Sequence, residues 1–100
     1  MTQTEVKQAA DEMVEMFTKI IWESGNTVSK PMIIDVCIAH CKRVIEVLEM
    51  LRKPEYTTFV LKYGEFDKKG NVVSNAELMD GYELINHYRL ILSELEGRVK

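Results

Sequence analysis

Residues 29–54 read SKPMIIDVCIAHCKRVIEVLEMLRKP, and this segment governs the architecture. Ser29 has the residue type of a helix N-cap, and Pro31 suits the first turn, where its missing amide hydrogen costs nothing. Pro54 stops the helix, so we expect it to run from about residue 30 to about Arg52. A helix this apolar is covered on more than one side, so we expect it to be central and the chain to self-associate. Its apolar positions are Ile33, Ile34, Val36, Cys37, Ile38, Cys41, Val44, Ile45, Val47, Leu48 and Leu51.

A second amphipathic helix is predicted upstream, over residues 4–24. Thr4 is the expected N-cap, and Gly25 supplies the left-handed residue that commonly ends a helix. On a helical wheel Trp22 points away from the apolar stripe of this helix, which makes it a candidate surface residue. The stripe consists of Val6, Ala10, Met13, Phe17, Ile20 and Ile21.

A third helix is predicted downstream, from Ser74 to about Gly97. Ser74 and Glu77 have the spacing of a capping box. Gly81 lies inside this predicted helix, where it marks close packing of a neighbouring backbone. The expected apolar stripe consists of Leu78, Tyr82, Ile85, Tyr88, Leu92 and Leu95.

The segment between the second and third helices has a mixed pattern. Residues 54–73 fit a helical face and also contain good strand formers, so periodicity leaves helix and hairpin open. Asp67–Gly70 has the composition of a type I turn and favours a hairpin. The fold class we expect is mainly α, a three-helix antiparallel bundle with a short irregular or β-hairpin excursion between helices 2 and 3. Residues 1–100 should form a single helical domain.

Composition narrows the function classes. The chain has 100 residues, 13 Lys and Arg against 16 Asp and Glu, and a net charge of −3. This charge gives no electrostatic footprint for nucleic acid. The longest unbroken apolar run has four residues, and the N-terminus has no signal-like apolar region, so we expect a cytoplasmic protein without membrane contact.

Chemistry-bearing residues are few. Cys37, His40 and Cys41 lie within about one turn of the second helix, and His87 is the remaining histidine. Both cysteines fall on the apolar face, where cysteine behaves as a small hydrophobic residue, so we expect no metal. The sequence has no nucleophile motif. We therefore predict no catalytic residue, no cofactor and no enzymatic activity.

The function that remains is interaction. We expect a small accessory protein, a homo-oligomer that presents a surface to a protein partner. Trp22, Tyr56 and Tyr63 are the predicted contact residues, because aromatic side chains outside the core stripes are common interface anchors. The alternative is a binder of a small anionic metabolite or nucleotide at the N-terminus of the second helix. Its predicted residues are Trp22, Thr27, Ser29 and Lys30.

Overall fold

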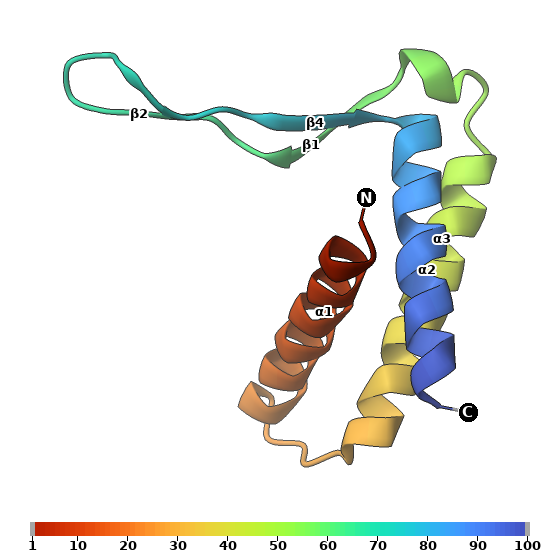
Figure 1. Cartoon of the computed structure of the whole chain (residues 1–100). Coiled ribbons are helices and arrows are strands. Elements are labelled where there is room, and N and C mark those ends of the chain that lie inside the picture. Colours follow the sequence, from red (N-terminus) through yellow and green to blue (C-terminus); the bar gives the residue numbers. More distant parts are fainter. Residues whose placement is uncertain (1, 100) are drawn as a thin grey trace.

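The computed structural model describes residues 2–99 and contains three long helices and a projecting β-hairpin (Figure 1). The helices are α1 (Gln3–Glu23), α2 (Lys30–Glu49) and α3 (Gly81–Arg98). Successive helices run in opposite directions, and all three pack against one another. In Figure 1, α2 and α3 lie side by side and α1 is inclined to them. The predicted antiparallel three-helix bundle is confirmed.

Two clusters of buried side chains hold the helices together. The larger cluster joins all three helices, and the smaller joins α2 to α3 near the root of the hairpin. Phe59 and Met79 of the hairpin pack on the smaller cluster. The larger cluster is Ala10, Val14, Ile33, Ile34, Cys37, Cys41, Ile91 and Leu95, and the smaller is Leu48, Leu84 and Ile85.

The hairpin is a long two-stranded ribbon, here called the β-arm (residues 58–80). A 3-10 turn, η1 (Pro54–Tyr56), leads into it. Near the helices β1 (Thr58–Lys62) pairs antiparallel with β4 (Glu77–Asp80), and farther out β2 (Glu65–Phe66) pairs with β3 (Val72–Ser74). The β-arm leaves the top of α2 and α3, runs past the N-terminal end of α1 and ends in solvent (Figure 1).

The turn at the tip confirms the predicted hairpin. Gly70 has a φ of 83°, and its N–H donates to the carbonyl oxygen of Asp67. The carboxylate of Asp67 accepts hydrogen bonds from the backbone N–H groups of Lys69 and Asn71, at 2.8 and 2.9 Å. These bonds close the turn through its own residues.

The predicted start of α3 was wrong. Ser74 and Glu77 lie in β3 and β4, and the helix begins at Gly81 with Asp80 as its N-cap. The side chain of Asp80 accepts a hydrogen bond from the N–H of Glu83 at 2.9 Å. Asp80 lies six residues after Ser74, and pairing of β4 with β1 keeps residues 77–80 extended, so the helix begins only after Asp80. Two members of the predicted stripe, Leu78 and Tyr82, are consequently exposed.

The other two helices need smaller corrections at their starts. Thr2, rather than Thr4, caps α1, through a capping box with Glu5. Ser29 is the N-cap residue of α2, but its side chain makes no capping hydrogen bond. In α1, Val14 is buried and Ile20 is exposed, because the helices that cover α1 lie to one side of the predicted stripe.

Helix ends and one packing contact follow the predictions more closely. Gly25 has a φ of 90° after α1, as expected. α2 ends at Glu49, three residues before Arg52. A Cβ added to Gly81 would lie 2.6 Å from the Cβ of Pro54, which confirms the close approach predicted there. Among residues 2–99, no helix combines the length and hydropathy required to cross a bilayer.

Candidate functional site: the β-arm and the cleft beneath it

The β-arm carries an unusual share of exposed large apolar side chains. Beyond Phe59 and Met79, no described residue of the β-arm belongs to or packs on a core cluster. Phe66 is 68% exposed and Val72 is 58% exposed. The exposed apolar residues of the β-arm are Val60, Leu61, Tyr63, Phe66, Val72, Val73 and Leu78.

Strand pairing arranges some of these side chains into cross-strand pairs. Cross-strand partners share one face of a ribbon, and neighbours along a strand point to opposite faces. Phe59 and Met79 form the pair that faces the helices. The next pair, Val60 and Leu78, therefore lies on the outer face, away from the core. Near the tip, Phe66 pairs with Val72 in the same way.

A cleft of about 440 Å³ lies between the β-arm, α1 and α3. Leu61 and Glu77 of the β-arm line one wall. The remaining walls are mostly apolar, with two polar groups, Glu12 and His87. Burial lowers the pKa of His87, which favours the neutral ring. From the helices, the lining residues are Ala9, Glu12, Met13, Met16, His87, Tyr88 and Ile91.

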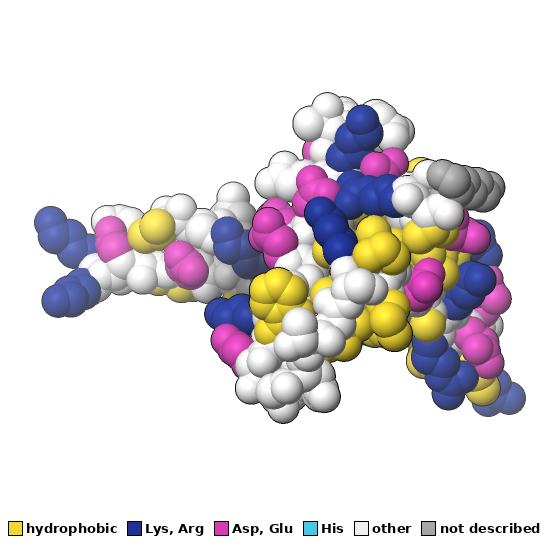
Figure 2. All heavy atoms as spheres, turned by 90° about the horizontal axis from the view of Figure 1, so that it is seen from below, with side chains coloured by type: hydrophobic (Ala, Val, Ile, Leu, Met, Phe, Trp, Pro, Cys, Tyr) yellow, Lys and Arg dark blue, Asp and Glu magenta, His cyan; other side chains and the backbone are white. Residues whose placement is uncertain are grey.

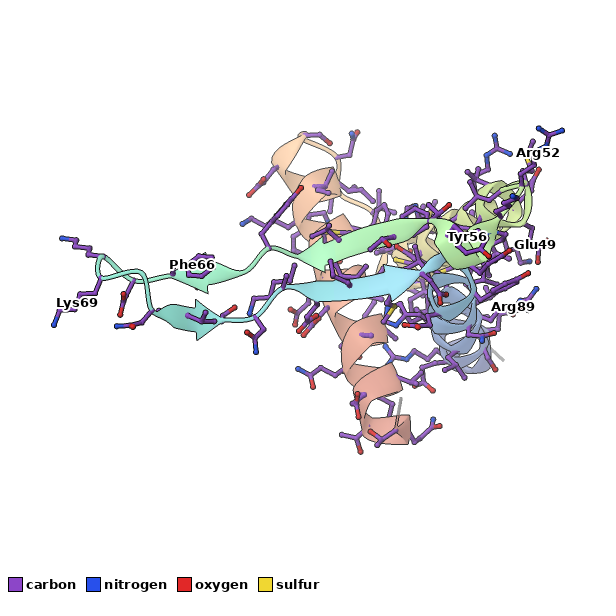
Figure 3. The ribbon with its side chains drawn as sticks, turned by 90° about the horizontal axis from the view of Figure 1, so that it is seen from above. Glu49, Arg52, Tyr56, Phe66, Lys69 and Arg89 are labelled. Atoms are coloured by element: carbon purple, nitrogen blue, oxygen red, sulfur yellow. The ribbon has the colours of Figure 1, made fainter. Side chains whose placement is uncertain are left out.

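The charges are distributed unevenly along the β-arm. Figure 3 shows Lys69 at the outermost point of the tip and Phe66 between the tip and the helices. In the space-filling view the end of the β-arm carries basic side chains, with acidic and hydrophobic ones behind them (Figure 2). Backbone hydrogen bonds, first from Asn71 and then from Lys69, lower the pKa of Asp67. Its carboxylate is therefore committed to the turn, while the ammonium groups project outward.

The three predicted contact residues are exposed but lie far from one another. Tyr63 is in the β-arm between β1 and β2 and is 80% exposed. Tyr56, at 78%, lies in η1 at the root, with the ammonium of Lys53 5.8 Å from its ring centroid. Trp22, at 57%, lies near the C-terminal end of α1, away from the β-arm. The structure thus places one of the three in the β-arm.

The predicted ligand residues are partly brought together. Trp22 and Lys30 line one cavity of about 460 Å³ between α1 and the start of α2. Lys19 adds a second cation to this cavity, and Glu15 adds an acid. Thr27 and Ser29 are not among its lining residues. The cavity is mostly apolar, so it resembles a site for a ring with an anionic substituent more than a site for free phosphate.

The cysteines lie where the sequence predicted. Both are completely buried, and burial raises the pKa of Cys41 to about 11 and also raises that of Cys37. His40 stacks edge-on between the rings of Phe17 and Tyr88, at centroid distances of 5.2 and 6.2 Å. Within residues 2–99, no group of three or more His, Cys, Asp or Glu residues is arranged to hold a metal ion.

The outer β-arm (residues 65–74, which contain β2, the turn and β3) was not predicted to carry contact residues. Phe66 and Val72 flank the turn predicted at residues 67–70 but were not among the predicted contact residues. A sequence signal for these exposed residues does exist. The hairpin segment contains many apolar residues, although its strands pair only with each other. A two-stranded ribbon can rest only one face on a core, so apolar residues on both faces leave some uncovered.

Comparison with known proteins found no matching protein-family model, no matching curated protein and no matching solved structure.

Proposed function

We propose that this chain is a small non-enzymatic interaction protein that presents its β-arm to a protein partner. The observation that supports this is the row of uncovered apolar side chains on a ribbon that projects from the helices (Figure 3). Contiguous exposed apolar surface with charged neighbours is typical of a protein interface. Exposed Phe and Tyr side chains are efficient anchors for such contacts.

The composition of the β-arm favours a protein over other partners. Lys62, Lys68 and Lys69 are offset by Glu65 and Asp67 in the same segment, so the surface lacks the dense positive charge that nucleic acid or an anionic bilayer attracts. Uncovered strand edges add backbone donors and acceptors, which a partner strand can pair with. Both features suit a folded or extended polypeptide.

An arm-shortened variant tests the proposal. Lys62 and Glu77 are cross-strand partners, so an Asn-Gly turn can replace residues 63–76 without changing the register at the root. Tagged wild-type and shortened proteins would be compared for retained proteins, including a differently tagged copy of the same chain. We expect shortening to reduce retention at least tenfold.

Met32→Ser is the matched control, since Met32 is an exposed apolar residue in the first turn of α2, and that end of α2 lies away from the β-arm (Figure 1). It should retain the same proteins as the wild type. Equal retention by the shortened variant would contradict the proposal, and unchanged helical circular dichroism would show that the shortened variant is folded.

A second candidate function is binding of a small aromatic anion in the cavity that Trp22 and Lys30 line. An indole ring offers a stacking face, and the ammonium groups of Lys19 and Lys30 offer charge to an anionic substituent. A nucleoside triphosphate is a suitable probe, with inorganic phosphate as its ring-free counterpart.

The test uses Trp22 as its own reporter, because it is the single tryptophan. A saturable change in its fluorescence with the nucleotide, weakened several-fold by Lys30→Ala, would support this function. Lys42→Ala is the control, since Lys42 is an exposed lysine on the same helix. An emission that stays constant up to millimolar nucleotide would exclude the nucleotide class.

A further inference from the structure

The single chain exposes more surface than a protein of its mass normally does. A compact 11.6 kDa monomer exposes about 5,800 Å², whereas this chain exposes 7403 Å². Its radius of gyration is 15.8 Å, against about 13 Å for a compact chain of this length. The excess of roughly 1,600 Å² per chain is about twice what one partner buries in a standard interface, about 800 Å², and lies within the roughly 1,000–2,500 Å² that each protomer buries in an obligate homodimer.

The β-arm contributes to this excess of exposed surface, because its outer half projects from the helices (Figure 1). An isolated two-stranded hairpin is marginally stable in water, and packing on a further element normally stabilises it. The β1–β4 half has that support from the helices through Phe59 and Met79. The β2–β3 half has none from the described helices, and its Phe66–Val72 pair remains exposed. The outer half therefore lacks the cover that the inner half has.

The cleft beneath the β-arm offers a complementary surface. Its floor includes Met13, Met16 and Ile91, whose thioether and aliphatic groups adapt to an inserted aromatic ring. The segment from Thr58 to Asp67 contains ten residues and would be about 33 Å long if fully extended, so the tip can reach well beyond its own bundle. An apolar side chain inserted from the ribbon thus has an apolar place to bind.

The charges of the tip and of the cleft are also complementary. Lys68 and Lys69 lie in the turn at the tip, with Lys69 at its outermost point (Figure 3), and the cleft carries Glu12 on α1 and Glu77 on β4. The helix that forms one wall of the cleft adds to its negative charge, because residues 1–25 contain five acids and two bases. A tip inserted into the cleft would bring ammonium groups close to carboxylates.

We infer that two copies of this chain associate about a two-fold axis, with the outer β-arm of each copy lying in the cleft of the other. The inference rests on the proposed function, since it names the partner of the same surface. Each chain contains both the insert and the receptor, so the reciprocal arrangement covers both β-arms at once and closes without further growth. Phe66 and Val72 provide the apolar contact, and Lys68 and Lys69 the charged one.

Sedimentation equilibrium over a range of concentrations is the first test. The wild type should have twice the 11.6 kDa chain mass. Phe66→Ser combined with Val72→Ser should weaken association at least tenfold, because two desolvated apolar contacts are lost. Met32→Ser should leave association unchanged. Because Phe66, Val72 and Met32 are exposed, we expect these variants to fold, and circular dichroism checks that they do.

Disulfide trapping tests the geometry itself. Val72→Cys and Met16→Cys would be prepared separately, with different tags, and mixed under mild oxidation. Cys37 and Cys41 are completely buried, so the introduced thiols are the reactive ones. A disulfide between the two tagged chains is the expected product. Val72→Cys mixed with Met32→Cys is the control pair and should give little cross-linking.

The outcomes separate this inference from the proposed function. A dimer that forms the Val72→Cys to Met16→Cys link and dissociates with the Phe66 and Val72 variants supports it. A dimer insensitive to those variants, or one that forms no such link, overturns it. A monomeric wild type also overturns it, and the proposed function then stands or fails by whether arm shortening removes a different protein.

Discussion

Many apolar residues lie in the interface between α2 and α3, here called the seam, and many also lie in the outer β-arm. Only those in the seam are covered by neighbouring side chains. Cys41 and Leu95 are completely buried in the seam, whereas Phe66 and Val72 of the β-arm face solvent. Helices can be packed on several sides, while a two-stranded ribbon rests on a core by one face at most. Apolar content therefore stabilises the fold in one region and remains available for association in the other.

The largest expected difference between the two regions comes from truncation of a core residue. Leu95→Ala should lower the free energy of unfolding by about 2–5 kcal/mol, because it removes buried methyl groups and leaves a cavity. Val73→Ala on the β-arm should change it by less than about 0.5 kcal/mol, since Val73 is exposed. Urea denaturation followed by helical circular dichroism measures both. Equal losses would mean that the β-arm is part of the cooperative core.

The junction between the two regions gives the next effect. Gly81→Ala should destabilise the fold by about 1–3 kcal/mol, because the new Cβ would lie within 2.8 Å of the Cα and carbonyl oxygen of Pro54. Gly97→Ala is the matched control in the same helix, with nothing within 4 Å of its added Cβ. It should be neutral or stabilising by up to about 1 kcal/mol. Thermal unfolding that ranks the two variants the other way would refute the close contact.

Ser74, the predicted N-cap of α3, can be compared with Asp80, the observed one. Asp80→Ala should cost about 1 kcal/mol, because the N–H of Glu83 loses its partner at the start of α3. Ser74→Ala should be neutral or slightly stabilising, since the Ser74 hydroxyl is buried with no hydrogen-bond partner. A larger loss from Ser74→Ala in urea denaturation would indicate that α3 begins earlier.

The smallest expected effect is confined to the tip. Hydrogen bonds to Asp67 lower its pKa from the ordinary 3.8, so they stabilise the turn above that pH. This stabilisation should be lost as pH falls through the lowered pKa, because protonation weakens the carboxylate as an acceptor. The amide resonances of Lys69 and Asn71 should follow that titration, and Asp67→Asn should abolish it. An apparent pKa at or above 3.8 would contradict the hydrogen-bonding pattern.

The helices were the most predictable part of the fold. The helical spacing of apolar residues from Ile33 to Leu48 predicts α2, and the glycine at position 25 predicts the end of α1, since side-chain periodicity and left-handed backbone are local properties. The start of α3 was not predictable in this way. Ser74 and Asp80 both suit an N-cap, and the choice depends on whether β4 pairs with β1.

The candidate site was predictable only in kind. Exposed aromatic residues were expected to be contacts, and Tyr63 does lie on the β-arm, but Trp22 lies at the far end of α1. The cleft combines residues of α1, α3 and the β-arm, which are remote in sequence. No local pattern indicates that Met16 and Leu61 would line the same hollow.

The sequence by itself determined the three helices apart from the start of α3, the position of the turn at the tip, and the burial of the cysteines, because these depend on spacing, turn chemistry and hydropathy over a few residues. Tertiary structure alone decided that β4 extends to Asp80 and that the outer β-arm stands free of the bundle. Strand pairing and cover depend on contacts between distant residues. The phenylalanine at position 59 is therefore partly buried against the core, whereas the one at position 66 is exposed.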